Sequence, residues 1–406
     1  MAELAPAFRQ APWLTIVGIG EDGLDGLSAA SREALAGADL VMGSARHLSL
    51  LLAISCRTLE WPVPFADGIA ALLAHRGSRV VMLASGDPFW FGAGSSVTRH
   101  LERHEWVAHP APSTFSLVAA RLGWALQDIA CHGLHAAPVA RLRPHLAAGA
   151  RAIVLLRDGA AVAELAAWLA GQGFGASRLH VLEALGGPRE RIRNARADAL
   201  DFTDIAHPVA VALECAGEGP AMQRTAGLPD EMFDHDGQIT KRPVRALTLS
   251  ALAPRPGECL WDIGAGSGSI GIEWLLAHPA NRALAIEADP ARAERARANA
   301  RALGVDRLEI VTGAAPDALP DGPGPDAVFI GGGLSQTLLE AVWTRLPAAT
   351  RLVANAVTLE SEALVAQWHA ERGGTLLRIE LADAAPLGDR RGWKARYPVV
   401  QWSVVL

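Results

Sequence analysis

The chain has 406 residues and a formal net charge of -6, with half of its residues apolar and a fifth charged. This length indicates two domains, or three, each large enough to bury a core of its own. The acidic balance gives no support to nucleic-acid binding or to a membrane surface, and no apolar run is long enough to span a bilayer. The segment from Met1 to Pro12 has no basic stretch leading into an apolar core, and the four cysteines lie far apart. We therefore expect a cytoplasmic protein.

The first half, from Trp13 to about Glu214, alternates short apolar runs with alanine-rich helical stretches. The sequence predicts strands at 14–19, 80–84, 153–156, 181–185 and 209–213. It predicts helices at 28–36, 95–103, 113–122 and 160–170, several of which open on serine, a good N-cap. Alternation of this kind indicates an α/β fold with a largely parallel sheet.

The pattern stops at residues 216–229, where glycine and proline are frequent, and restarts at Thr240. We therefore expect a domain at 1–215, a linker at 216–229 and a second domain at 230–406. In the second domain the sequence predicts strands at 259–263, 283–287, 308–311, 327–330 and 352–354. It predicts helices at 243–252, 269–277, 290–303, 335–346 and 359–370. The runs 375–381 and 398–405 predict a terminal antiparallel pair, which flanks a polar stretch at 388–396.

The pattern G-x-G-x-x-G occurs twice, beginning at Gly18 and at Gly266, and by itself it is a weak signal for nucleotide binding. NAD has to be considered at both loops. In the first loop Glu21 and Asp22 stand where a pyrophosphate needs bare amides, and two carboxylates there would repel the phosphates. NAD is therefore disfavoured at the first loop.

The second loop has acids that suit a different cofactor. Asp262 comes two residues before Gly264, so it could face a cationic ligand group. S-adenosylmethionine carries an ammonium and a sulfonium and no phosphate. Glu287, at the tip of the next strand, suits the two ribose hydroxyls, although NAD would use the same contact. Ala314 and Ala315, after the third strand, could flank an adenine ring. The simpler interpretation is that the glycines serve only a tight turn.

Segments of the second half carry a family resemblance. Residues 262–268, Glu287, 313–315 and 329–333 resemble the class I, S-adenosylmethionine-dependent methyltransferases. Residues 230–233, 240–245 and 355–360 are similar, more narrowly, to the decarboxylating precorrin methyltransferases of cobalamin biosynthesis. The resemblance covers roughly residues 225–406 and implies a Rossmann-like domain. It implies cofactor contacts from Thr240, Asp262, Gly264, Ala265, Gly266, Ser267, Gly268, Glu287, Ala314 and Ala315.

The first half, over roughly residues 13–214, resembles the class III tetrapyrrole methylases through the motifs 17–20, 84–88 and 110–114. The resemblance implies two α/β lobes with the cofactor in the cleft between them, held largely by backbone groups. It implies cofactor contacts from Gly86, Asp87, Pro88, Ser113 and Thr114, with Gly18 and Gly20 on the floor where substrate enters. Glu183 and Leu213 lie on segments that could also reach this cleft.

Both halves in this order resemble the fused precorrin-6Y C(5,15)-methyltransferases (decarboxylating). The resemblance implies S-adenosylmethionine at two sites, one per domain, and a late precorrin as substrate. It implies methyl transfer to carbons 5 and 15 and loss of the ring C acetate as carbon dioxide. It also implies a homo-oligomer formed through the C-terminal domain. Two alternatives stay open: a two-domain methyltransferase acting on another tetrapyrrole or small molecule, and a cofactor-binding scaffold without turnover.

The expected chemistry needs positioning more than a strong base, because the macrocycle is an electron-rich nucleophile and its ring system accepts the electrons of decarboxylation. A general acid could protonate the carbon that carbon dioxide leaves. By their proximity to the matched motifs, His235, Asp236 and Glu360 are candidates for this catalytic role, with ordinary solvated loop residues as the alternative.

Precorrins carry many acetate and propionate groups, which an acidic protein has to bind with local positive charge. Two basic clusters stand at 241–245 and 390–396, and from them we expect substrate contacts by Lys241, Arg245, Arg390 and Arg391. The alternative is a solvated charged face. Phe89, Trp90 and Phe91 could stack on the macrocycle or pack between lobes. The scattered Cys131, His132 and His135 do not have metal-ligand spacing, so we expect no metal.

Overall fold

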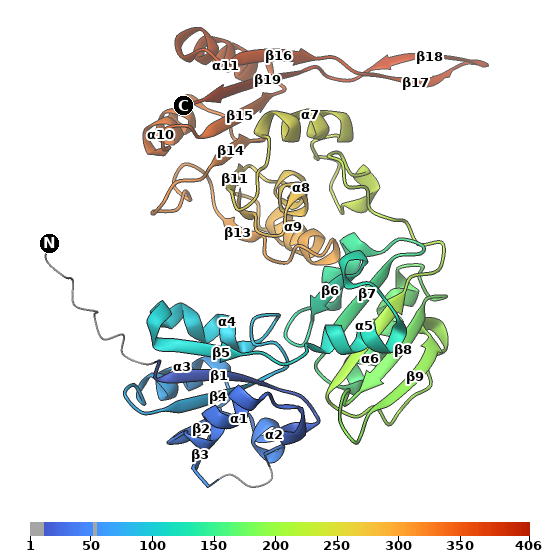
Figure 1. Cartoon of the computed structure of the whole chain (residues 1–406). Coiled ribbons are helices and arrows are strands. Elements are labelled where there is room, and N and C mark those ends of the chain that lie inside the picture. The colour runs from blue at the N-terminus through green and yellow to red at the C-terminus, as the bar shows by residue number, and fades with distance from the viewer. Residues whose placement is uncertain (1–11, 52–54) are drawn as a thin grey trace, which may run out of the picture. The chain divides into compact units, whose positions relative to one another are not determined.

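The computed structural model describes residues 12–51 and 55–406. The described chain forms two compact units, one of residues up to 139 with 147–220 and one of residues 140–146 with 221–406 (Figure 1). The division at 220 falls inside the expected linker, and the domain limits 215 and 230 stay predictions. The expectation of a cytoplasmic protein used the segment from Met1 to Pro12, nearly all of which lies outside the described ranges. Within those ranges no helix has both the length and the apolar character needed to cross a bilayer.

The first lobe of unit 1 contains a five-stranded sheet in which every paired strand is parallel. The order is β3-β2-β4-β1-β5. Strand β1 is apolar along most of its length because helices cover both faces of such a sheet. The strands are β1 (Leu14–Ile19), β2 (Leu40–Gly43), β3 (Arg57–Glu60), β4 (Val80–Ser85) and β5 (Trp106–His109). The helices are α1 (Ala29–Ala36), α2 (Ala45–Ser49), α3 (Phe65–Leu73) and α4 (Ala93–Val97).

The second lobe of unit 1 has a five-stranded sheet of order β6-β7-β10-β8-β9, in which only β6 and β7 pair in parallel. The expected parallel sheet is therefore wrong for this lobe. The connection between β8 and β9 is only residues 184–190, which is too short for the crossover that a parallel pair requires. The strands are β6 (Ala130–Gly133), β7 (Arg151–Leu156), β8 (Arg178–Glu183), β9 (Arg191–Arg196) and β10 (Val209–Glu214). The helices are α5 (Thr114–Leu122) and α6 (Gly159–Gly171).

Unit 2 is built on a seven-stranded sheet of order β13-β12-β11-β14-β15-β19-β16. The first five strands are parallel, and β19 runs antiparallel to both of its neighbours, as expected for the closing pair. The chain direction across the sheet reverses between β11 and β14, the place where open α/β sheets bind ligands. The strands are β11 (Cys259–Ile263), β12 (Arg282–Glu287), β13 (Glu309–Thr312), β14 (Ala327–Ile330), β15 (Arg351–Ala356), β16 (Thr375–Ile379) and β19 (Val399–Val405).

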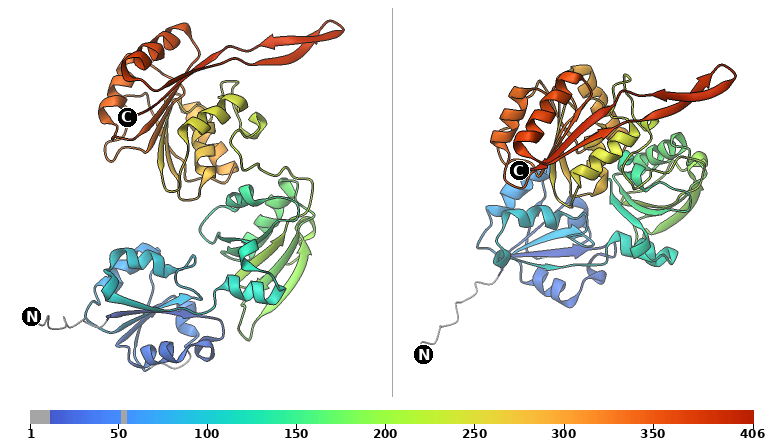
Figure 2. Two further views of the ribbon diagram at one scale, coloured as in Figure 1. Left: turned by 45° about the horizontal axis from the view of Figure 1, so that its top comes forward. Right: turned by 90° about the horizontal axis from the view of Figure 1, so that it is seen from above.

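Helices cover both faces of this sheet (Figure 2). One face packs Leu249 of α7 and Trp274 of α8 against Leu260 and Phe329. The other packs the α10 and α11 residues Val342 and Trp368 against strand residues. The helices are α7 (Arg242–Leu252), α8 (Ser269–Ala277), α9 (Pro290–Ala302), α10 (Gln336–Arg345) and α11 (Leu359–Arg372).

A hairpin of β17 (Ala382–Leu387) and β18 (Arg390–Ala395) replaces the expected polar stretch. It projects beyond the edge of the seven-stranded sheet and forms a separate two-stranded sheet (Figures 1 and 2). Leu387 and Trp393 on it are 70% and 80% exposed. The hairpin is therefore an arm of unit 2 that exposes two large apolar side chains.

Candidate functional site

The glycine loop after β11 depends on glycine at particular positions. Gly264 and Gly266 have φ of +70° and +58°, the left-handed region that glycine adopts without strain. A Cβ on Gly264 would lie 2.6 Å from the backbone of Gly332 in the loop after β14. The two loops can approach this closely because residue 264 is glycine, and the approach shapes the crevice at the reversal of the sheet.

A cavity of about 1250 Å³ opens at this crevice. It exceeds the roughly 300–1,000 Å³ of ordinary small-molecule pockets, so it has room for a cofactor and for part of a larger substrate. The expected residues that line it are Thr240, Lys241, Gly264, Ala265, Gly266, Ser267, Glu287, Ala314 and Ala315. Gly268 is not among the lining residues: it is the N-cap of α8, with φ of +77°.

Glu287 fixes the glycine loop from the end of β12. Its Oε2 accepts a hydrogen bond of 2.7 Å from the backbone N–H of Gly266, and its Oε1 accepts one of 3.0 Å from Asp289. Each carboxylate oxygen has a second acceptor site, so Glu287 can still accept from ligand hydroxyls in the cavity it lines.

Asp262 lies beneath the loop instead of in the cavity. It is 1% exposed, and its Oδ2 accepts a 2.9 Å hydrogen bond from the N–H of Gly271 in α8. Burial, together with the nearby charge of Glu287, raises the pKa of Asp262 to about 7. The expected direct contact with a cationic ligand group is therefore not supported, because this strand residue points toward α8.

The buried hydroxyl group of Ser267 supports a ligand site at this cavity. The Ser267 side chain lines the cavity, the residue is 3% exposed, and its Oγ has no hydrogen-bond partner among the described residues. A buried hydroxyl without a partner is unfavourable. A ligand in the cavity would satisfy it, so the loop fits a polar cofactor.

Arg245 cannot serve as the expected substrate contact. Its side chain is fully buried, with Nε 2.5 Å from Glu273 and Nη1 3.0 Å from Asp230, and it also donates to two backbone carbonyls. The sequence carried a signal for this placement. Arg245 lies four and seven residues before Leu249 and Leu252, on the buried face of α7.

The three candidate acids lie outside the cavity lining. The Gln238 backbone N–H and the Arg292 guanidinium lower the pKa of Asp236 to about 2, so it stays ionised and cannot donate a proton near neutral pH. His235 accepts a 3.0 Å hydrogen bond from Gly237, and Glu360 is exposed in the first turn of α11. The structure therefore gives none of them a catalytic position.

The basic residues of the late polar stretch separate into two groups. Arg390 and Arg391 are exposed on β18 and do not line the cavity. Lys394 and Arg396, at the base of the hairpin, do line it, and Arg396 also pairs with Asp383. Asn355, at the end of β15, is a further lining residue to which the sequence analysis gave no role. Of the two basic clusters, Lys241, Lys394 and Arg396 therefore lie on the cavity wall, whereas Arg390 and Arg391 do not.

Unit 1 has a second cavity, of about 290 Å³, lined by loops from both of its lobes. Gly18 is required beneath it, because a Cβ there would lie 1.9 Å from the carbonyl oxygen of Gly86. The expected residues on its wall are Gly20, Gly86, Asp87, Ser113 and Thr114. The structure buries Pro88 behind this wall, and Glu183 and Leu213 are also buried away from the cavity.

The negative charge of Glu21, beside this cavity, is balanced by two arginines. Glu21 is 8% exposed and pairs with Arg46 and with Arg189, the latter at 2.9 Å. The repulsion of phosphates inferred from Glu21 is therefore weaker than the sequence suggests.

His47, which also lines this cavity, is a neutral imidazole. Burial and the neighbouring charge of Arg46 lower its pKa to about 3. Its Nε2 lies 2.8 Å from Ser85 Oγ.

The aromatic trio packs against its own unit. Trp90 stacks on Phe115 with ring centroids 5.1 Å apart, and Phe89 lies 5.4 Å from Trp106. Trp90 and Phe91 also line the unit 1 cavity. Packing therefore accounts for much of the trio, while two of its rings still face the cavity.

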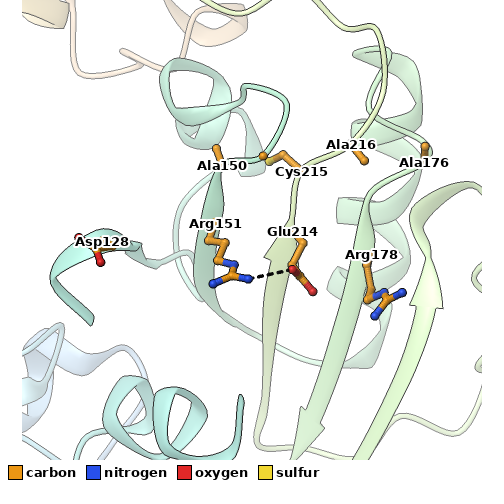
Figure 3. Close-up of a pocket in the computed structure, with 9 residues that line it drawn as sticks. Asp128, Ala150, Arg151, Ala176, Arg178, Glu214, Cys215 and Ala216 are labelled. Atoms are coloured by element: carbon orange, nitrogen blue, oxygen red, sulfur yellow. Dashed lines mark hydrogen bonds and ion pairs between the residues drawn. The ribbon is translucent and has the colours of Figure 1, made fainter. Parts of the chain in front are cut away.

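A third cavity, of about 750 Å³, lies at the ends of β7, β8 and β10 (Figure 3). On its wall Arg151 of β7 pairs with Glu214 of the adjacent β10 at 3.3 Å, and Arg178 lies on the next strand, β8. No expected site residue lines it. In the described part of the chain, no three His, Cys, Asp or Glu side chains are grouped to hold a metal ion.

Comparisons with known proteins match both units. Residues 13–201 match the family described as tetrapyrrole (corrin/porphyrin) methylases, and residues 231–406 match the precorrin methyltransferase domain. A Sinorhizobium sp. relative named precorrin-6Y C(5,15)-methyltransferase (decarboxylating) is 50% identical over 97% of this chain and 96% of its own length.

A Mycobacterium tuberculosis relative of the same name is 43% identical over 96% of this chain and 99% of its own length. A crystal structure of the C-terminal domain of a Rhodobacter capsulatus precorrin-6Y C5,15-methyltransferase is 55% identical. It covers 46% of this chain and 100% of that chain, with a TM-score of 0.44. The identity over nearly the whole length shows that the chain belongs to the precorrin-6Y C(5,15)-methyltransferase (decarboxylating) family.

Proposed function

We propose that this methyltransferase acts at carbons 5 and 15 of a late precorrin in cobalamin biosynthesis and removes the ring C acetate as carbon dioxide. The observation that carries the proposal is the presence of two separate cavities, each formed by glycine loops within its own unit. Family membership supplies the reaction, and the two cavities supply a place for each methyl transfer. We assign one methylation to unit 1, and the other methylation with decarboxylation to unit 2, whose cavity is larger.

The cofactor we propose is S-adenosylmethionine, one molecule per unit, which when bound supplies an electrophilic methyl group. In unit 2, Glu287 would accept from the ribose hydroxyls, and Ala314 and Ala315 would flank the adenine. The partnerless Ser267 hydroxyl supports this fit. In unit 1 the Gly86–Asp87 turn and Ser113–Thr114 would hold the cofactor, mostly through backbone groups.

The substrate half of the unit 2 cavity combines positive charge with apolar surface. Lys241, Lys394 and Arg396 would pair with precorrin carboxylates. Leu338 and Val399 line the same half and would exclude water from the macrocycle. Methyl transfer and decarboxylation are both favoured when a reactant is held in position in such a site.

We also propose that copies of the chain assemble through the C-terminal unit. The β17–β18 hairpin supports this proposal, because it leaves strand edges uncovered within its own chain and exposes Leu387 and Trp393. Natural proteins rarely leave such an arm unpaired, since an open edge is a template for association. Light scattering should show an assembly that Trp393→Ser weakens, and a monomeric wild-type chain would contradict it.

The direct test is to incubate the full chain with precorrin-6Y and S-adenosylmethionine and to follow the product by mass spectrometry. We expect a product with two added methyl groups and one carboxyl group fewer. Cofactor labelled on the methyl group should label both new carbons. A chain that binds the cofactor but leaves the mass of precorrin-6Y unchanged would favour the scaffold alternative.

A further inference from the structure

Asn355 lies in the part of the unit 2 cavity that a cofactor would leave free. The proposed cofactor contacts come from the loops after β11, β12 and β13, whereas Asn355 lies near the end of β15, on the other side of β14. Apolar side chains, among them Leu338, Val357 and Val399, line the same cavity. A half-buried amide in this setting is placed to contact substrate.

A buried polar network holds this amide. Asn355 Nδ2 donates to Thr248 Oγ1 at 3.0 Å, and Asn355 Oδ1 accepts from Gln401 Nε2 at 3.0 Å. Gln401 Nε2 also donates to Thr248 Oγ1 at 3.0 Å, which closes a triangle between α7, β15 and β19. Thr248 is 0% exposed and Gln401 is 3% exposed. Such a network fixes one orientation of the amide.

The network leaves hydrogen-bonding capacity on the cavity side. A carboxamide has two N–H donors and two acceptor sites, and the network uses one of each. The second N–H of Asn355 is therefore left for the cavity that the residue lines. It is a neutral donor, held in place from behind, in a cavity whose wall also carries apolar side chains.

We propose that Asn355 binds the acetate that leaves as carbon dioxide, with Thr248 and Gln401 as positioning residues. The inference rests on the proposed function of unit 2. In the step, the bond between the acetate methylene and its carboxylate breaks, and its electron pair passes into the conjugated ring. Carbon dioxide leaves, and a proton from water then converts the methylene to a methyl group.

A neutral donor suits a departing carboxylate better than a cation does. In an apolar site a guanidinium paired with the carboxylate would lose a large Coulomb attraction as the charge moves into the ring. An interaction stronger in the ground state than in the transition state slows the reaction. A neutral amide loses far less attraction as the charge moves away, and it still orients the acetate. Lys241 and Lys394 remain available for the precorrin carboxylates that are not removed.

The test compares the full-length wild type with Asn355→Ala and Asn355→Asp, measuring carbon dioxide release from precorrin-6Y with S-adenosylmethionine present. Asn355→Ala should slow release by roughly ten- to a hundredfold, because the acetate would no longer be held with its breaking bond aligned to the ring system. The affinity of unit 2 for S-adenosylhomocysteine should not change. Release within twofold of wild type would overturn the inference.

Asn355→Asp separates substrate contact from a structural role. Its carboxylate should repel the acetate, so release should recover as the pH falls and the new carboxylate is protonated. A structural defect would instead lower the affinity of unit 2 for S-adenosylhomocysteine together with the rate of release, and that result would also overturn the inference. Thr248→Val should lower the rate less than Asn355→Ala, because it only loosens the amide. A wild-type chain that releases no carbon dioxide would overturn the proposed function and this inference together.

Discussion

Asp262 and Glu287 are carboxylates beside one glycine loop, yet their surroundings give them different tasks. Glu287 lines the cavity and holds Gly266 by a backbone hydrogen bond. Asp262 is sealed beneath the loop, and its Oδ1 has no partner within the described ranges of the chain. The first acid is available to a ligand, and the second orients α8 at a cost in stability.

The raised pKa of Asp262 makes the stability of unit 2 depend on pH. In the unfolded chain the proton is lost near the ordinary value of 3.8, while the folded chain keeps it to about 7. The folded state therefore binds more protons between these values, and its stability falls as the pH rises, by about 1.4 kcal/mol per pH unit. Asp262→Asn removes this loss and keeps an acceptor for Gly271.

Urea denaturation at pH 5 and at pH 8 tests the prediction. Asp262→Asn should gain stability over wild type, and the gain should be larger at pH 8 than at pH 5. Asp321→Asn on an exposed loop is the control and should show the same small effect at both. An equal effect of Asp262→Asn at the two pH values would contradict a raised pKa.

Arg245 is predicted to act on stability and not on substrate binding. Arg245→Met leaves Glu273 as a buried charge without its partner, which typically costs about 3–5 kcal/mol. Arg390→Met, at an exposed position, should change the free energy of unfolding by less than about 0.5 kcal/mol. Adding Glu273→Leu to Arg245→Met should recover part of the loss. A stable Arg245→Met chain with weakened precorrin binding would restore the original substrate role.

At the scale of elements, the sequence predicted those with strong periodicity and missed those without it. Strands β1, β11 and β14 and helix α8 have the predicted limits, because each is a largely apolar run and a glycine directly follows each strand and precedes the helix. The short strands β2 and β3 and the arginine-rich β9 were not predicted. Alternate residues of β9 face solvent, so its pattern is half polar.

The β17–β18 hairpin was missed for a related reason. Neither of its strands buries a full face, so charged residues and glycine dominate the stretch. Among the site residues, those of the glycine loops line the cavities, and their role in cofactor binding stays a prediction. The direction in which Asp262 points could not be predicted, because it depends on packing between α8 and the sheet.

The base of the hairpin, not its tip, is predicted to bind substrate carboxylates. Lys241→Ala with Lys394→Ala should weaken precorrin-6Y binding by about tenfold, since two positive charges leave the cavity wall. Affinity for S-adenosylhomocysteine should stay the same. Arg390→Ala with Arg391→Ala is the matched control of equal charge change and should have little effect in a fluorescence titration. If the Arg390→Ala and Arg391→Ala chain binds precorrin-6Y more weakly than the Lys241→Ala and Lys394→Ala chain, the substrate contacts lie at Arg390 and Arg391 instead.

At the scale of the whole molecule, each unit has a cavity of its own. Among the described residues, the unit 1 cavity is lined by unit 1 alone and the unit 2 cavity by unit 2 alone. The fusion of two unlike α/β domains could be predicted from the two motif sets. The antiparallel second lobe could not, because its topology is set by the short connection between β8 and the arginine-rich β9, a strand that the sequence pattern did not reveal.

The central claim is that one chain holds two independent sites for a sulfonium cofactor. Calorimetric titration of the full chain with S-adenosylhomocysteine tests it most directly. We predict two molecules bound per wild-type chain, and one each in Asp87→Ala and in Glu287→Ala, with the remaining site keeping its wild-type affinity. A wild-type chain that binds one molecule or none, or that binds NADH instead, would contradict the account.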